Sequence, residues 1–314
     1  MRRVSLIGAA SGWGAGIRET ESGPLALREF GLAEALQERG IAADWTAMVE
    51  PKRRWRDAPD LLREAVFRLV VQHDAALADA VAGAVASKTL PVVIGGDHSI
   101  AVGTWGGIAR ARKGAPFGLI WFDAHLDAHT METTPSGNPH GMSAAVLLGH
   151  GDKELLAIGG GVLRPENLCY IGARSYEEGE LALLQRLGVR IVYMEEIHRR
   201  GLQAVLDDAV AVATAGTSGF GITIDLDGFE PEDAPGIGLK TPDGLCRDEM
   251  LPALASLAGR ADLLAIEIVE YIPEFDIDLR TAKLARDLLI ALLAPQPAKR
   301  VSRRPTLPTT TALV

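Results

Sequence analysis

The sequence predicts an α/β fold in which parallel strands are joined by crossover helices. Short apolar runs rich in Val, Ile and Leu alternate with longer segments that have helical periodicity. Several helical segments are followed by a glycine, a residue that commonly ends a helix. A chain of 314 residues, 47% of them hydrophobic, can bury a large core, so we expect a single domain over residues 1–294.

Strands are expected where an apolar run is too short to form a helix, and helices where the apolar residues recur with helical spacing. The expected strands, in chain order, are Arg3–Ala9, Leu90–Ile94, Phe117–Phe122, Leu168–Ile171, Arg190–Tyr193, Gly219–Ile224 and Asp262–Val269, with an eighth near Ala42–Ala47. The expected helices are Pro24–Arg39, Ala58–Ala86, Ile100–Arg112, Gly141–Leu148, Glu178–Leu187, Leu202–Ala215, Arg247–Ala258 and Leu279–Leu293.

Composition excludes several classes of protein. Lys and Arg total 32 against 41 Asp and Glu, and this net charge of −9 leaves no broad basic surface for nucleic acid. The two cysteines, Cys169 and Cys246, are too few for a disulfide scaffold. We therefore expect the protein in the reducing cytoplasm. The apolar run after Met1 is too short for a secretory signal, and no stretch approaches the roughly 20 apolar residues of a membrane span. Residues 295–314, rich in Pro, Thr, Arg and Lys, are expected to be disordered or ordered at an oligomer interface.

Three polar segments directly follow three predicted strands, at the sheet edge where ligands gather. Gly95–Ser99 carries His98, and Asp123–Asp127 places acids on either side of His125 at alternate positions, which project to one side of an extended chain. Asp225–Asp227 repeats the pattern with two acids. Each segment has an alternative interpretation. The first could carry a structural histidine, the second could be a solvated acidic loop, and the third could be an ordinary Asp-x-Asp-Gly turn.

Together these segments supply four carboxylates and two imidazoles: His98, Asp123, His125, Asp127, Asp225 and Asp227. Such an oxygen-rich set of ligands is typical of a site for a hard or borderline ion such as Mn²⁺, and not of a zinc site built from thiolates. Two dications would cancel the four negative charges, which would otherwise raise some of the carboxyl pKa values. Two ions roughly 3.5–4 Å apart would generate hydroxide near neutral pH. The segments therefore predict a binuclear metal hydrolase with a small polar substrate.

In order and spacing the three segments resemble the metal-binding motifs of the ureohydrolases, the arginase and agmatinase family. Glu21–Pro24 and Ile268–Pro273 are similar to further stretches of that family. The resemblance implies an arginase-type three-layer fold, a parallel sheet of about eight strands with helices on both faces, two Mn²⁺ per subunit and commonly a trimer or hexamer. It implies one ion at His98, Asp123, Asp127 and Asp225, and the other at His125, Asp123, Asp225 and Asp227, with Asp123 and Asp225 bridging.

The resemblance also implies a reaction, the hydrolysis of a guanidino group to urea and an amine. His140 resembles the family's proton shuttle, for which a loop histidine is the alternative. Glu270 resembles the carboxylate that pairs with the substrate guanidinium, for which a surface acid is the alternative. With Asp127, these two residues make up the expected catalytic set.

The segment Thr130–Asn138 resembles the loop with which arginases hold the substrate's α-carboxylate. Ser136 and Asn138 match its pattern and carry suitable donors. Other positions depart from the family, because His129 stands where arginases usually carry Asn, and Glu177 stands where a shorter acid would hold the α-amino group. The segment 234–239 also lacks the threonine that is usual near its end.

L-arginine, cleaved to L-ornithine and urea, is therefore the leading substrate. Guanidinobutyrate and guanidinopropionate are the alternatives, agmatine ranks lower because it has no carboxylate, and formiminoglutamate stays open. Two other classes of protein are alternatives. One is a deacetylase-like hydrolase with a single Zn²⁺, in which His98 and Asp127 would not be needed as ligands. The other is a non-catalytic relative, but such proteins are expected to lose metal ligands that this chain retains.

Overall fold

The computed structural model describes residues 2–58 and 60–294 and contains one sheet of eight strands, all parallel to their neighbours. The strand order is β2-β1-β3-β8-β7-β4-β5-β6. The strands are β1 (Val4–Ala9), β2 (Ala43–Val49), β3 (Leu90–Gly95), β4 (Gly118–Phe122), β5 (Leu168–Ala173), β6 (Arg190–Tyr193), β7 (Phe220–Asp225) and β8 (Leu263–Val269). The predicted fold class and the eighth strand are confirmed.

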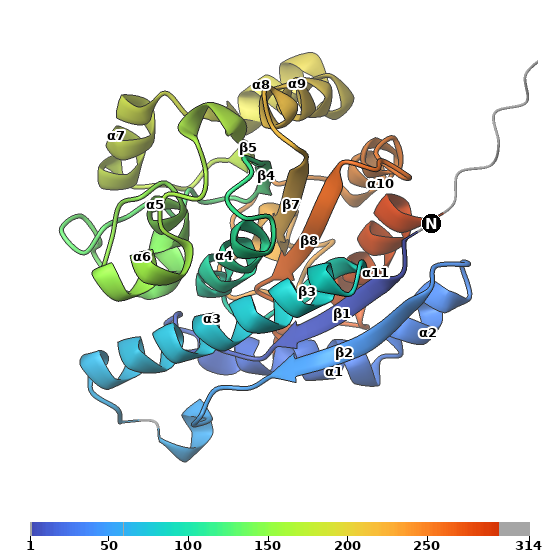
Figure 1. Ribbon diagram of the computed structural model, residues 1–314. Coiled ribbons are helices and arrows are strands. Elements are labelled where there is room, and N and C mark those ends of the chain that lie inside the picture. Colours follow the sequence, from blue (N-terminus) through green and yellow to red (C-terminus); the bar gives the residue numbers. More distant parts are fainter. Residues whose placement is uncertain (1, 59, 295–314) are drawn as a thin grey trace, which may run out of the picture.

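The sheet lies between two layers of helices, as Figure 1 shows. Strand residues alternate between the layers, so that Val92 and Ile94 of β3 pack with one layer and Val93 with the other. The first layer contains α1 (Gly23–Glu29), α2 (Leu32–Gln37), α8 (Met194–Arg200), α9 (Leu202–Thr214), α10 (Arg247–Ala255) and α11 (Arg280–Leu293). The second contains α3 (Arg63–Ala86), α4 (Ala101–Ala111), α5 (Ser143–Leu147) and α7 (Glu178–Leu187). Because both faces are covered, the strands read as continuous apolar runs in the sequence.

Several predicted helix boundaries were wrong. The helix predicted over Pro24–Arg39 is interrupted at Gly31, whose left-handed φ of 82° separates α1 from α2. The third helix begins at Arg63 and not at Ala58, and α6 (Lys153–Gly159) and α8 were not predicted. Short 3₁₀ turns lie at Arg18–Ser22, Trp55–Asp57, His98–Ile100, Pro139–Met142, Pro165–Asn167, Leu226–Gly228 and Pro273–Phe275. The prediction for residues 295–314 lies outside the described residues.

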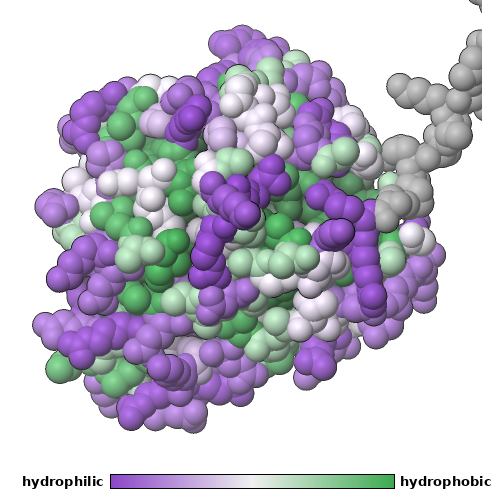
Figure 2. All heavy atoms as spheres, viewed as in Figure 1, coloured by the Kyte–Doolittle hydropathy of each residue, from purple (hydrophilic) through white to green (hydrophobic). Residues whose placement is uncertain are grey.

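Helix α3 has the length and apolar composition of a membrane span, so the expectation that no segment would have them was wrong. It packs closely on α4, since a Cβ added at Gly103 of α4 would lie 2.7 Å from the carbonyl oxygen of Asp74. Its buried residues include the ionisable side chains of His73 and Asp74. Figure 2 shows hydrophilic and apolar side chains interspersed on the face that carries these two helices. The apolar composition of α3 is therefore used in packing against the protein core.

The buried side chain of Asp74 is expected to make the stability of the fold depend on pH. Its carboxylate is fully buried, accepts no hydrogen bond from the described residues and lies 3.9 Å from Nδ1 of His73, which is beyond hydrogen-bond distance. Burial raises the pKa of Asp74 to about 7, above the roughly 3.9 expected in the unfolded chain. Between these values the folded state binds more protons, so the contribution of Asp74 to stability falls as the pH rises from about 4 to 7.

We expect Asp74→Asn to raise the free energy of unfolding by about 2 kcal/mol at pH 8, with the gain shrinking towards pH 5. Urea unfolding of both proteins across this pH range would measure the difference. Asp79→Asn, an exposed acid on the same helix, is the control and should change little. Parallel pH profiles of wild type and Asp74→Asn would contradict the prediction.

Candidate metal centre

The three polar segments meet at the carboxyl edge of the sheet because their strands are close together in it. In the order β3-β8-β7-β4, His98 follows β3, Asp123 follows β4 and Asp225 ends β7. Glu270 follows β8, between β3 and β7. Figure 1 shows these strands side by side at the centre of the molecule. Residues up to 172 positions apart thereby contact each other, since the backbone N–H of His98 donates to Oε1 of Glu270 at 2.8 Å.

The first cluster gathers three carboxylates around one imidazole nitrogen. Nδ1 of His98 lies 3.0 Å from Oδ2 of Asp225, 3.1 Å from Oδ2 of Asp127 and 3.2 Å from Oδ2 of Asp123. All four side chains are buried. Their potential ligand atoms lie within 4.8 Å of one another, which is close enough for one metal ion to contact them all.

The second cluster overlaps the first. Nδ1 of His125 lies 3.2 Å from Oδ2 of Asp227 and 3.4 Å from Oδ1 of Asp123. The other oxygen of Asp227 is buried and has no hydrogen-bond partner among the described residues, so it is free to bind a ligand. Asp123 belongs to both clusters, whereas Asp225 groups with the first alone, and its bridging role stays a prediction.

In each of the three motifs, the first acid is held by the same kind of local turn. The amide of Ser99 donates to Asp97, that of His125 to Asp123 and that of Asp227 to Asp225, at 2.7–2.9 Å. Each is the bond of an Asx turn, in which a carboxylate accepts from the amide two residues on. The turn and metal alternatives for Asp225–Asp227 are therefore compatible, because the turn fixes a carboxylate that lies in the first cluster.

A second set of buried groups supports His98 from behind, and sequence analysis missed them. Nε2 of His98 lies 3.0 Å from Oγ1 of Thr223, which donates to Glu267 at 2.8 Å. The imidazole also stacks on Trp121, whose indole N–H donates to Asp123 at 2.8 Å. The available signal was Thr223 in the middle of the apolar run of β7 and Glu267 in that of β8. These contacts fix the orientation of the ring that carries the expected ligand atom.

The electrostatics of the clusters match a site built for cations. Burial, and then the charges of Asp227 and Asp123, raise the pKa of Asp225 well above its usual value. For His98, burial lowers the pKa, but the surrounding carboxylates outweigh it and the net shift is upward. Four carboxylates and two imidazoles with no thiolate suit hard or borderline dications, so the residues fit the metal pair that their sequence pattern implies.

Above the clusters lies a cavity of about 290 Å³ that brings most of the predicted site residues together. Its lining includes His125, Asp127, His129, Ser136, Asn138, His140, Glu177, Asp225, Asp227 and Glu270. The other two predicted residues, His98 and Asp123, are buried next to it. Within the cavity, Nδ1 of His140 lies 3.6 Å from Oε1 of Glu270. The expected catalytic pair is thus adjacent to the clusters.

The lining of the cavity also includes Glu180, an acid that sequence analysis missed. Glu180 is buried and accepts from the amides of Glu177 and Ala128 at 3.0 and 3.3 Å. Glu177 in turn lies 3.1 Å from Nε2 of His129, so the two predicted substrate residues contact each other. Glu180 stands at the third position of helix α7, where an acid completes a capping box, and this spacing was the signal available.

A parallel α/β sheet with two overlapping His/Asp clusters beneath a cavity lined by further acids and histidines is suited to metal-dependent hydrolysis. The chain belongs to the arginase family, whose sequence model matches residues 2–294. It is 35% identical over 297 residues to the arginase of Bacillus caldovelox, covering 93% of this chain and 98% of that one. It is therefore a metal-dependent amidinohydrolase, and the resemblance inferred from the motifs is confirmed.

Solved structures of arginases have the same fold as this chain. The crystal structure of arginase from Bacillus subtilis superposes with a TM-score of 0.85 at 34% identity, covering 94% of this chain and 99% of that one. The native arginase of Bacillus caldovelox superposes with a TM-score of 0.86 at 34% identity, with the same coverage. Formimidoylglutamase from Bacillus subtilis, at 22% identity and a TM-score of 0.74, shares the fold.

Proposed function

We propose that the protein is a binuclear manganese hydrolase that converts L-arginine to L-ornithine and urea. The observation that carries the proposal is the cavity itself, which places two His/Asp clusters, a buried acid and the Ser136–Asn138 loop around one space. The similarity to arginases over 93% of the chain supports the same substrate. Non-catalytic relatives are expected to lose ligands, and here all six expected ligands lie in the clusters.

Manganese is the ion that the donor set favours. Carboxylate groups outnumber imidazoles by four to two, and neither free cysteine belongs to a cluster. His98 and Asp127 would be surplus to a single-zinc site, yet both lie in the first cluster. When bound, two such ions supply the Lewis acidity that activates water for attack on a guanidinium carbon.

Glu270 is the group best placed to orient the guanidinium. Its Oε1 accepts from the amide of His98, whereas Oε2 accepts no hydrogen bond from the described residues. A carboxylate can pair with a planar guanidinium through charge-assisted hydrogen bonds. Such a pair would hold the reacting carbon beside the metal clusters, which is a positioning role.

His140 is the group best placed to move a proton. Burial lowers the pKa of His140, but the neighbouring Glu270 carboxylate outweighs this effect and the pKa rises to about 9. At neutral pH the imidazole is then protonated and can donate to the leaving amine. Its position 3.6 Å from Glu270 places the proton donor next to the proposed guanidinium site.

The outer part of the cavity supports an α-amino acid as substrate. Ser136 and Asn138 offer hydroxyl and amide donors for a carboxylate, and His129 could add a third. Glu177 and Glu180 are the acids that could pair with an α-ammonium group, whose positive charge would offset the burial that raises the pKa of Glu180 to about 8. Guanidinobutyrate and guanidinopropionate would leave these two acids without an ammonium partner, and agmatine would leave the carboxylate donors without an acceptor.

Urea release tests the proposal directly. The Mn²⁺-loaded protein would be assayed with L-arginine, agmatine, guanidinobutyrate and guanidinopropionate, next to an EDTA-treated control and a determination of bound metal. We expect metal-dependent urea chiefly from L-arginine. Preference for a guanidino acid without an α-amino group would overturn the substrate assignment and leave the family and fold unaffected.

Asn138→Ala tests the carboxylate loop. We expect KM for L-arginine to rise about tenfold with kcat within about twofold, because the loop contacts the end of the substrate remote from the reaction. Inhibition by agmatine, which has no carboxylate, should not change. Gln185→Ala, which removes an exposed amide on α7, is the control. An unchanged KM for L-arginine would remove Asn138 from the carboxylate site.

We propose a cytoplasmic location, which the two free cysteines favour. The trimer or hexamer that is common in the family stays a prediction, and sedimentation of the purified protein would determine the oligomeric state.

A further inference from the structure

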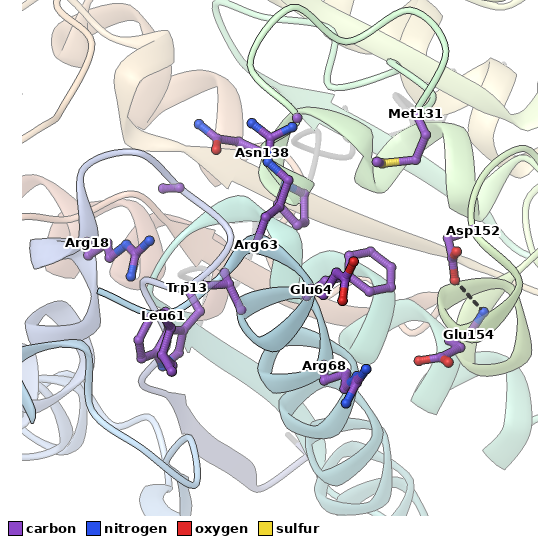
Figure 3. A pocket seen from close by; sticks show the side chains of 15 residues that line it. Trp13, Arg18, Leu61, Arg63, Glu64, Arg68, Met131, Asn138, Asp152 and Glu154 are labelled. Carbon is purple, nitrogen blue, oxygen red and sulfur yellow. Dashed lines mark hydrogen bonds between the residues drawn. The ribbon is translucent and has the colours of Figure 1, made fainter. Parts of the chain in front are cut away.

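The proposed carboxylate loop lies between two cavities. On one side, Ser136 and Asn138 line the metal cavity. On the other, Gly137 and Asn138 line a second cavity of about 490 Å³ that is also lined by Trp13, Arg18 and the first turns of α3. Figure 3 shows the side chain of Asn138 at the edge of this second cavity, next to Arg63. With a cavity on each side, the loop has little protein packed against it.

Arg63, the first residue of α3, contacts the loop from the side of the second cavity. Its Nη2 donates to the carbonyl oxygen of Ser136 at 2.8 Å. Its guanidinium also lies directly against Gly137, because a Cβ added at that glycine would collide with Nη1 of Arg63. Gly137 has a φ of 71°, a conformation that favours glycine, so the close approach and the turn both depend on the missing side chain.

The other hydrogen bonds of residues 134–138 are local. The amide of Gly137 donates to Oγ1 of Thr134 at 2.9 Å, and the amide of Asn138 donates to Oγ of Ser136 at 3.2 Å. The amide of Thr134 donates to the carbonyl oxygen of Thr130. Asn138 is also the N-cap of the adjacent 3₁₀ turn Pro139–Met142. Among the hydrogen bonds of the described residues, the bond from Arg63 is the one that links residues 134–138 to an element distant in the sequence. It anchors them to a helix of 24 residues that packs on α4.

We propose that Arg63 is a positioning residue for substrate recognition, holding Ser136 and Asn138 in place from outside the metal cavity. The inference rests on the proposed function, because it assumes that these two side chains receive the substrate carboxylate. Arg63 itself lines the second cavity and not the metal cavity, so it acts through the loop. Its loss should weaken binding of the carboxylate end and leave the reacting guanidinium in place.

Arg63→Ala should raise KM for L-arginine roughly three- to tenfold with kcat within about twofold. Bound metal should be unchanged, and inhibition by agmatine, the carboxylate-free probe, should be unaffected. Arg63→Lys should recover part of the loss, because an ammonium can still donate to the Ser136 carbonyl but cannot match the planar guanidinium against Gly137.

Arg68→Ala is the matched control. Arg68 lies on the next turns of α3, lines the same second cavity and forms no hydrogen bond or ion pair within the part of the chain that the structure describes. The substitution removes the same charge from the same surface, so it should leave KM within about twofold of wild type. An equal rise in KM for Arg63→Ala and Arg68→Ala would show a general charge effect and overturn the proposal.

Amide hydrogen exchange of residues 130–138 gives a second readout that does not depend on the substrate. Arg63→Ala should accelerate exchange in this segment, whereas Arg68→Ala should not. If wild type released no urea from L-arginine, the proposed function would fail, and exchange would still decide whether Arg63 holds the loop. Unchanged exchange, or loss of kcat together with bound metal, would overturn the positioning role.

Discussion

Asp123→Asn is expected to abolish urea release, with kcat falling roughly a thousandfold or more, equivalent to about 4 kcal/mol of transition-state stabilisation. The reason lies in the position of the residue between the two clusters. Its Oδ2 lies 3.2 Å from Nδ1 of His98, and its Oδ1 lies 3.4 Å from Nδ1 of His125. An amide is neutral and has one oxygen where the carboxylate has two, so both clusters lose the negative charge of Asp123 and one of them also loses its oxygen ligand atom.

Bound metal is the decisive second measurement for Asp123→Asn. We expect the metal content to fall below two ions per subunit, because the substitution removes both a ligand atom and a negative charge from the site. Asp208→Asn, an acid half-exposed on α9, is the control and should keep both activity and metal. Full retention of metal and turnover in Asp123→Asn would contradict the binuclear site.

The strands and the metal motifs were predictable because short-range patterns encode them. Continuous apolar runs indicate strands buried on both faces, and all eight were found within a few residues of their predicted bounds. Acids and histidines directly after a strand indicate a site at the sheet edge, and Asp123, His125 and Asp127 do lie in the two clusters. The extended chain assumed for them was wrong, because an Asx turn follows Asp123 and Asp127 has a left-handed φ of 49°. The strand order was not predictable in this way, because the pairing of β3 with β8 depends on contacts between distant residues.

Residues that act through distant partners escaped sequence analysis. Glu267 supports His98 through Thr223, and that chain of contacts exists only because β3, β7 and β8 are neighbours in the sheet. In the sequence, Arg63 resembles any surface arginine, and its role is visible only through its bond to Ser136 in the structure. Gly31 shows the same limit for local structure. Apolar periodicity continues across it, and only its left-handed φ reveals that the helix ends there.

Glu270→Gln separates substrate orientation from metal binding. The amide oxygen of Gln can still accept from the backbone N–H of His98, a contact that Oε1 of Glu270 makes at 2.8 Å. The remaining group is then an NH₂, which repels the N–H donors of a guanidinium where the carboxylate accepted them. We expect kcat/KM for L-arginine to fall roughly 100- to 1000-fold, because a buried charge pair loses one partner.

Metal content should stay at two ions per subunit in Glu270→Gln, in contrast to Asp123→Asn, because Glu270 belongs to neither cluster. Glu274→Gln is the matched control, an exposed acid that pairs with Arg56 outside the metal cavity, and it should stay within about twofold of wild type. Activity within about threefold of wild type in Glu270→Gln would exclude the guanidinium contact. A loss of metal as large as the loss of activity would instead assign Glu270 to the support of His98, since the two residues are joined by the same hydrogen bond.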